Sequence, residues 1–328
     1  MQAWFLPTVS VIVPAYNAAR TIRMAIEALM GQDYPKDLFD VTVVDDGSKD
    51  DTGDIARRYP VRYVRQENKG PATARNHGAM LAKGGIILFT DADCVPKADW
   101  IREMIKPFVD PKIVAVKGAY RTGQTGMMAR FSQLEFEERF EMLKKAEFID
   151  MVDTYSAGFR REIFESFGGF DTSFPEANNE DTELSYRMSN AGHNMVFNPD
   201  AIVSHLNHPD SIKRYARIKF WRGYWRIVVY KRFPGKAVKD TYTPQTLKLQ
   251  ILSFMLIAGS IPFAAAATAY GIYILILSVG IFILLSIPFV LMVFRKDPLL
   301  AWLTPAFLLL RAGSIGSGAL WGAVKGRG

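Results

Sequence analysis

Apolar runs alternate with segments of helical spacing along the first hundred residues. Four short apolar runs predict strands, and three intervening segments with apolar residues at helical spacing predict helices. These predicted elements alternate over residues 9–13, 21–30, 39–44, 51–59, 61–64, 71–82 and 86–90. Such alternation is typical of a parallel, doubly wound sheet. Open α/β sheets bind ligands beyond the carboxyl ends of their strands, so polar clusters at those ends are the candidate site residues.

The next hundred residues complete this domain with less regular elements. Residues 113–117 predict a strand, and residues 201–204 predict another that ends at His205. Between them, large apolar residues recur at near-helical spacing and predict a helix with a stripe facing the core. The stripe consists of Phe131, Leu134, Phe136, Phe140 and Leu143. We therefore expect one mostly parallel α/β domain over residues 1–208.

Charge nearly vanishes from residue 247 onwards. Residues 249–269 and 272–294 are apolar and long enough to cross the hydrocarbon core of a bilayer. A third apolar segment, residues 299–324, contains Pro305 and Arg311 and is rich in Gly and Ser in its second half. That segment either spans, re-enters or packs against other helices. Residues 247–328 are thus a predicted membrane region of two or three helices.

A basic, aromatic segment over residues 209–246 precedes the membrane region. The chain carries a net charge of +7, and residues 213–239 hold ten Lys and Arg with no Asp or Glu. Basic and aromatic residues together occur in single-stranded nucleic-acid sites. They also occur in interfacial helices on anionic membranes, and the adjacent apolar segments favour that interpretation. We expect a multi-pass protein of the cell membrane, whose α/β domain is cytosolic by the positive-inside rule, and no nucleic-acid partner.

Two carboxylates follow the strand over residues 86–90. Asp91 and Asp93 stand two residues apart, so both side chains can be presented at the sheet edge. Hard oxygen ligands suit Mg²⁺ or Mn²⁺, which bridge phosphate oxygens. A short acidic turn alone is more often merely solvated, so the neighbouring clusters decide its meaning. The single cysteine, Cys94, excludes an internal disulfide and a cysteine-rich zinc site.

Further polar clusters follow the other predicted strands, and together they resemble the family 2 glycosyltransferases of GT-A fold. The resemblance covers about residues 8–206, with the motifs in the family's order. It rests on Pro14-Ala15-Tyr16-Asn17, Asp45-Asp46-Gly47-Ser48, Asn68-Lys69-Gly70, Ala74-Arg75-Asn76, Asp91-Ala92-Asp93 and Asn179-Glu180-Asp181. The resemblance implies an inverting transfer of sugar from a nucleotide-sugar donor, with a UDP-sugar as the expected donor.

The resemblance also implies roles for individual residues. Asp46 would accept hydrogen bonds from the base, Asp91 would contact ribose or sugar, and Asp93 would hold Mg²⁺ or Mn²⁺. His205 would be a third metal ligand, or else a partly buried structural histidine. Carboxylates suit N–H and hydroxyl donors, and basic groups suit phosphate. The remaining donor-binding residues would be Pro14, Ala15, Tyr16, Asn17, Lys69, Gly70 and Arg75.

The acceptor side is implied by Asn179-Glu180-Asp181, which resembles the family's motif at the start of a helix. Asp181 would be the catalytic base that takes a proton from the acceptor hydroxyl, and Glu180 would orient the acceptor. Alternatively, both acids simply favour a helix N-terminus electrostatically. The turn at Gly168-Gly169-Phe170 is expected to be structural, with Phe170 packed inside.

The basic segment bears on the acceptor. Arg217, Arg222 or Arg226 would hold a phosphate of the acceptor or of the leaving diphosphate. The local sequence matches the Gln/Arg-x-x-Arg-Trp motif of processive synthases poorly, which favours transfer of one sugar to a lipid or lipid-linked acceptor. The alternatives are a processive polysaccharide synthase subunit, a sugar-nucleotidyltransferase or an inactive membrane scaffold. The residues after the first strand are not the glycine-rich loop that a nucleotidyltransferase needs.

Overall fold

The computed structural model describes residues 6–174 and 178–326, which form two compact units. The first unit comprises the chain up to Gln124 together with Leu143–Asn207. The second comprises Thr125–Met142 and the chain from His208 onwards. The sequence placed residues 125–142 in the first domain. They belong to the second unit because helix α5 (Met127–Leu143) buries apolar residues against the C-terminal helices.

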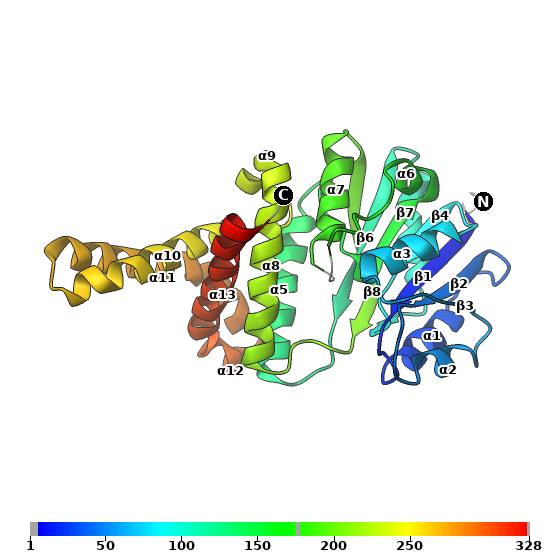
Figure 1. The fold of residues 1–328 in the computed structure, drawn as a ribbon, viewed down its shortest axis with the longest axis horizontal. Helices are drawn as coiled ribbons and strands as arrows, with labels where there is room; N and C mark the ends of the chain where they lie inside the picture. Colours follow the sequence, from blue (N-terminus) through cyan, green and yellow to red (C-terminus); the bar gives the residue numbers. More distant parts are fainter. Residues whose placement is uncertain (1–5, 175–177, 327–328) are drawn as a thin grey trace. The chain divides into compact units, whose positions relative to one another are not determined.

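The first unit is built on an eight-stranded sheet with the strand order β3-β2-β1-β4-β7-β6-β8-β5 (Figure 1). Its N-terminal half is parallel, as the sequence predicts, and β1 lies in the middle of that half. The buried runs and the helices between them come close to their predicted bounds. These elements are β1 (Val9–Ala15), α1 (Ile22–Met30), β2 (Phe39–Asp45), α2 (Thr52–Ala56), β3 (Arg62–Arg65), α3 (Pro71–Met80) and β4 (Ile86–Phe89).

The other half of the sheet is mixed, so the sheet as a whole is less parallel than the sequence predicts. Strand β7 (Ala157–Arg160) runs antiparallel to both of its neighbours, β4 and β6 (Ile113–Arg121). Strand β5 (Cys94–Pro96) is antiparallel to β8 (Asn194–His205), whereas β6 and β8 are parallel. Hydrophobic periodicity reports which face of a strand is buried and not its direction, so it did not predict these reversals.

The remaining helices of the first unit connect these strands. They are α4 (Trp100–Ile105), α6 (Arg161–Ser166), α7 (Glu180–Asn190) and the short 3₁₀ helices η1 (Lys106–Val109) and η2 (Thr154–Ser156). A cluster of aromatic rings packs at the end of β4, where Phe170 lies 5.3 Å from Phe89 and 5.2 Å from Phe164 between ring centroids. Gly168 and Gly169 have φ of +72° and +71°, a conformation that glycine adopts without strain. The structural turn predicted there is confirmed.

The second unit is helical. Besides α5 it contains α8 (Ile212–Arg232), α9 (Pro234–Val238), α10 (Gln245–Ala265), α11 (Ala269–Lys296), α12 (Pro298–Ala301) and α13 (Thr304–Lys325). Three of these helices, α10, α11 and α13, are long and apolar enough to cross a membrane. Figure 1 shows α10 and α11 as a hairpin that reaches away from α13, α8 and α5.

A buried ionic cluster lies where the helices of the second unit meet. Glu135 of α5 is fully buried and lies 2.8 Å from the Lys219 ammonium of α8 and 3.4 Å from the Arg311 guanidinium of α13. Arg311 also donates to the side-chain oxygen of Gln250 in α10 at 2.7 Å. Burial lowers the pKa of Lys219 to about 7, although Glu135 opposes this shift. The cluster links the helices α5, α8, α10 and α13.

Candidate active site

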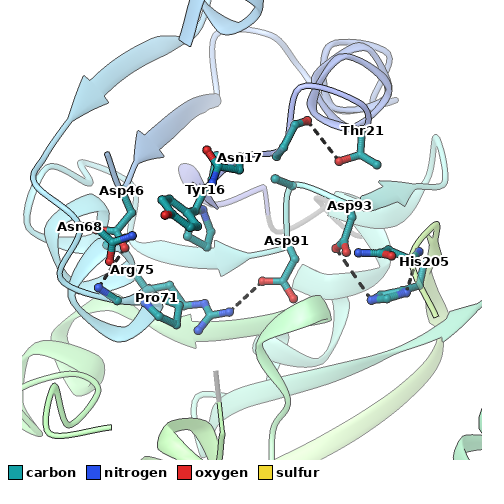
Figure 2. Close-up of a pocket in the computed structure, with 17 residues that line it drawn as sticks. Tyr16, Asn17, Thr21, Asp46, Asn68, Pro71, Arg75, Asp91, Asp93 and His205 are labelled. Carbon is teal, nitrogen blue, oxygen red and sulfur yellow. Dashed lines mark hydrogen bonds and ion pairs between the residues drawn. The ribbon is translucent and has the colours of Figure 1, made fainter. Parts of the chain in front are cut away.

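A cleft of about 620 Å³ opens where the parallel strands of the first unit end (Figure 2). Its walls come from the loops after β1, β2 and β4, from the start of α3 and from the end of β8. This is the edge at which the sequence placed its polar clusters. The lining residues are Pro14, Ala15, Tyr16, Asn17, Ala18, Thr21, Asp46, Asn68, Gly70, Pro71, Ala74, Arg75, Asp91, Ala92, Asp93, His205 and Asn207.

The loop after β1 is fixed to the turn after β2 by short hydrogen bonds. The backbone N–H of Asn17 donates to Ser48 Oγ at 2.9 Å, and the N–H of Ser48 donates to Asp45 Oδ1 at 2.7 Å. Asn17 has a φ of +50°, which asparagine tolerates better than most residues. The ring of Tyr16 is left 48% exposed beside the cleft. A rigid loop therefore presents one large aromatic face to any planar ligand.

Asp46 lies in the cleft wall, but its oxygens are already engaged. Oδ1 accepts from Gln66 Nε2 at 2.8 Å and from the N–H of Lys69 at 2.9 Å. Oδ2 accepts from the N–H of Gly70 at 2.9 Å. His77 Nδ1 lies 2.8 Å from Gln66 Oε1 and so helps to hold that amide. Asp46 shapes the loop before α3, and a carboxylate retains lone pairs for further donors.

Arg75 occupies the centre of the site, between two acidic residues that are far apart in the sequence. Its guanidinium donates to Asp91 Oδ1 at 2.8 Å and to Glu180 Oε1 at 2.7 Å. The residue is 2% exposed. Burial opposes the charge, but Asp91 and Glu180 outweigh it and raise the pKa of the Arg75 guanidinium. Arg75, expected to bind the donor directly, thus bridges the end of β4 to the start of α7.

The start of α7 carries the acidic pair expected on the acceptor side. Asn179 precedes the helix with a φ of +73°, so the chain turns sharply into Glu180 and Asp181. Burial raises the pKa of Glu180 to about 7, the Asp181 carboxylate adds to this rise, and Arg75 opposes it. Oε2 of Glu180 has no hydrogen-bond partner among the described residues. Asp181 is partly exposed, so it is the more accessible of the two carboxylates.

Asp93 and His205 come together at the far end of the cleft, as Figure 2 shows. The Nε2 atom of His205 lies 3.8 Å from Asp93 Oδ1, and Cys94 adds a third potential ligand to the same group. Burial raises the pKa of Asp93 and nearby Asp91 adds to this, whereas His205 lowers it. One divalent ion bound at about 2.1 Å from each ligand atom fits between oxygen and nitrogen atoms at this separation. The residues present therefore suit a metal ion.

Four other predicted site residues are not among those that line the cleft. Only the backbone of Lys69 contacts Asp46, and the residue is not among those that line the cleft. Arg217, Arg222 and Arg226 lie on α8 in the second unit, and the guanidinium of Arg222 sits 5.7 Å from the ring centroid of Phe136. Sequence reasoning missed Gln66, Thr21 and Asn207. Gln66 lies in the loop before the Asn68 motif, but nothing in the sequence indicated that it reaches Asp46.

The known proteins that this chain resembles are glycosyltransferases. The family described as "Glycosyl transferase family 2" matches residues 10–168. Glycosyltransferase AglE of Haloferax volcanii is 29% identical over 225 residues, which are 65% of this chain and 72% of that protein. Probable glycosyltransferase YdaM of Bacillus subtilis is 31% identical over 241 residues, 67% of this chain. The chain spans 53% of the length of YdaM.

A solved structure shares the fold over nearly the whole chain. Mannosyltransferase PcManGT from Pyrobaculum calidifontis, solved with GDP-Man and Mn²⁺, has a TM-score of 0.65 and 23% identity. The match covers 98% of this chain and 89% of that one. At this level of identity the likeness establishes the fold.

Proposed function

This chain is a family 2 glycosyltransferase with a GT-A fold, and we propose that it transfers one sugar, with inversion, from a nucleotide-sugar donor to a lipid or lipid-linked acceptor. The observation that carries the proposal is the single cleft that gathers Asp91, Asp93 and His205 and is tied by Arg75 to the acidic start of α7. A donor in that cleft would lie between a metal-binding end and a candidate base.

The nucleoside end of the donor would be held by the loops after β1 and β2. The exposed ring of Tyr16 offers a stacking face for the base. Asp46 holds the loop of residues 66–70 and would accept from a base N–H with its remaining lone pairs. Asp91, whose side chain is 29% exposed, would accept from a ribose or sugar hydroxyl while it keeps its bond to Arg75. We expect a UDP-sugar.

The diphosphate would lie beside Asp93 and His205, which would hold Mg²⁺ or Mn²⁺. When bound, the ion would neutralise charge on the diphosphate as the glycosidic bond breaks. The Mn²⁺ of PcManGT supports a divalent ion here. Asn207, which also lines the cleft, hydrogen-bonds Asp93 and so fixes the orientation of that carboxylate. Arg75 keeps Asp91 pointed at the donor.

Asp181 is the proposed catalytic base. The acceptor hydroxyl oxygen would form a bond to the anomeric carbon as the bond to the diphosphate oxygen breaks, and the nucleoside diphosphate would leave with that electron pair. The hydroxyl proton would pass to Asp181, which is more exposed than Glu180. Glu180 would act as a positioning residue through Arg75. A phosphate acceptor is already ionised, so Asp181 would matter less for such a substrate.

The second unit supports the proposed acceptor class. Three helices long and apolar enough to cross a membrane support an enzyme that works at a bilayer, where a lipid-linked acceptor would be delivered. Arg217, Arg222 and Arg226 belong to the basic helix α8 and would hold an acceptor or leaving-group phosphate. We place the catalytic unit on the cytosolic side, where nucleotide sugars are made.

The test uses the purified full chain in detergent. Titration calorimetry with UDP and GDP, with and without Mn²⁺, should give tight binding of one nucleotide that depends on the metal. Incubation with the labelled donor and a membrane lipid extract should then add a single sugar mass to a lipid, detected by mass spectrometry. Products that carry a ladder of sugars would indicate a processive synthase. Nucleotide binding without any transfer or donor hydrolysis would indicate an inactive scaffold.

A further inference from the structure

Helix α13 packs along α8 over nearly its whole length, and both helices run in the same direction. Glycines of α13 face the backbone of α8 in order along both helices. A Cβ at Gly318 would collide with the carbonyl group of Phe220, and one at Gly322 would collide with that of Tyr224. One turn further on, a Cβ at Gly326 would meet Val228. Small residues are what allow two helix backbones to approach so closely.

Further contacts join α8 and α13 along their lengths. Gly223 of α8 faces the backbone of Ile315, where a Cβ would also collide. At the C-terminal end the Lys231 ammonium donates to the carbonyl oxygens of Gly322, Ala323 and Gly326 at 3.0–3.3 Å. At the other end, Glu135 joins Lys219 of α8 to Arg311 of α13. Helices held side by side in this way must lie at similar depths in a membrane.

Helix α8 is far too basic to cross a bilayer. It contains eight Lys and Arg residues and no acid within its 21 residues. Charged side chains inside the hydrocarbon core lose their hydration at high cost, whereas at the interface they face water and anionic headgroups. Since α13 follows α8 along its length, a spanning α13 would draw these charges into the membrane.

The face of α13 that turns away from α8 is apolar and exposed. Trp302 lies just before the helix, and Trp321 stands near its C-terminal end. Tryptophan is enriched at the headgroup level of membranes. The α10–α11 hairpin also exposes large apolar side chains, and the same property suits this face of α13 to contact with lipid. Its exposed large apolar residues are Trp302, Leu303, Leu309, Leu320, Trp321 and Val324.

The base of the hairpin packs against α13, where Phe289 of α11 shares a buried cluster with Phe307 and Leu308. Arg311 bonds Gln250, and Gly316 lies where a Cβ would collide with Met255, all within the first half of α10. Beyond that crossing the hairpin exposes apolar side chains, and Figure 1 shows it reaching away from α13 and α8. The hairpin begins at Gln245, after α8 and α9, and ends at Lys296, just before α12 and α13.

We propose that α13 does not cross the membrane and lies in the plane of one membrane interface beside α8, so that only the α10–α11 hairpin enters the bilayer core. The apolar face between Trp302 and Val324 would then rest on the lipid. The buried Arg311 guanidinium is paired with Glu135 and hydrogen-bonded to Gln250 within the protein, so it does not need contact with water. This assignment is independent of the sugar and of the acceptor.

Depth measurements along α13 test the proposal in the full chain, reconstituted in vesicles with an anionic lipid. A Cys94→Ser parent receives single nitroxide labels at Leu303→Cys, Leu309→Cys and Leu320→Cys, all exposed positions on the free face. Collision with dissolved oxygen and with a water-soluble nickel complex should report nearly the same shallow depth at all three sites. In a spanning helix, which rises about 1.5 Å per residue, the second site would lie several ångströms deeper than the first and would overturn the proposal.

Side-specific labelling gives an independent readout. Single cysteines at Leu299→Cys and Lys325→Cys flank α13, and Tyr270→Cys marks the tip of the hairpin, where Tyr270 is 85% exposed. In sealed membranes of known orientation, an impermeant maleimide should label the two flanking sites from the same side. It should label the hairpin tip from the opposite side. Labelling of the two flanking sites from opposite sides would show that α13 spans.

A matched pair of substitutions tests the packing itself. Gly318→Leu should lower the melting temperature of the detergent-solubilised protein by several degrees, because the new side chain has no room against Phe220. Ser317→Leu, at the exposed neighbouring position, should leave the melting temperature nearly unchanged. Equal melting temperatures for both variants would show that α8 and α13 are not paired as described. Should Gly318→Leu fail to fold, the depth and labelling experiments still decide the topology.

Discussion

Both units bury an arginine against carboxylates, but they use it differently. Arg75 in the first unit and Arg311 in the second are 2% and 1% exposed. Arg75 bonds Asp91, which faces the cleft, whereas Arg311 bonds Glu135 and Gln250, both fully buried between helices. A buried arginine–carboxylate pair therefore orients the side chains of the candidate active site in the first unit. In the second unit it holds helices together.

The two units also differ in how they obtain their shape. The first relies on the strand ends, where backbone turns at Asn17 and Gly70 shape one cleft, while the turn at Asn179 brings Glu180 to Arg75. The second relies on close approach between helices, which glycines on α13 permit. A polar change at the strand ends should thus alter chemistry, whereas a change of size on α13 should alter stability.

The largest effect is expected at Asp93. Asp93→Ala should reduce metal-dependent turnover by roughly a thousandfold, the upper range for losing one electrostatic group at a reaction centre. The physical reason is that Asp93 and His205 share one candidate metal position. Donor turnover across a Mn²⁺ titration measures the effect. Retention of full activity with unchanged Mn²⁺ dependence would remove Asp93 from the metal site.

The paired arginines should separate activity from stability. Arg75→Met leaves Glu180 buried without its cation, which should cost about 3 kcal/mol of unfolding free energy and most of the turnover. Arg311→Met should cost only about 1 kcal/mol, because Glu135 keeps Lys219 at 2.8 Å. Donor hydrolysis by this variant should stay close to that of the wild type. Denaturation curves and hydrolysis rates of both variants measure the difference.

Matched control variants show whether the unpaired Glu180 carboxylate causes the loss of stability in Arg75→Met. Adding Glu180→Gln to Arg75→Met should restore much of the stability, since the uncompensated carboxylate is gone, without restoring the turnover. A loss of hydrolysis in Arg311→Met as large as that in Arg75→Met would break the division between the two units.

Asp181→Asn should reduce transfer by roughly a hundredfold, the scale expected for losing a general base, and should leave donor affinity nearly intact. Asp181 does not line the donor cleft, so the nucleotide should bind as before. Calorimetry with the nucleotide, beside the transfer rate, measures both properties. Weakened nucleotide binding at an unchanged rate would instead assign Asp181 to the donor side.

The smallest effect concerns pH. Glu180 has a pKa of about 7 when folded, against an ordinary value of 4.5. Between these values the folded protein holds a proton on Glu180 that the unfolded chain releases, so the contribution of Glu180 to stability is fully present below pH 4.5 and is lost as the pH rises through 7. The melting temperature of the wild type should therefore lose a few degrees between pH 5 and 7.5. In Glu180→Gln this loss should be smaller, and an equal loss would assign the slope to other groups.

The sequence alone determined the local elements and the list of candidate groups. A continuous apolar run, such as residues 86–89, predicts a buried strand. Candidate ligand-binding residues follow such strands because the carboxyl ends of parallel strands meet at one edge of the sheet. The apolar segments of the C-terminal region were also visible, because length and lack of charge are local properties, although the sequence left open whether the third one spans. These features depend on neighbours within one turn or one strand, which the sequence displays directly.

Only the tertiary structure decided what those elements do together. The bridge from Arg75 to Glu180 joins residues that are 105 positions apart, and no local pattern predicts such a pair. The direction of β7, the transfer of α5 to the helical unit and the alignment of α13 with α8 likewise depend on which surfaces fit. A hydrophobic pattern specifies that a face is buried, whereas packing against a particular partner specifies where. For that reason the third apolar segment has the composition of a membrane span but the packing of a helix bound to a basic neighbour.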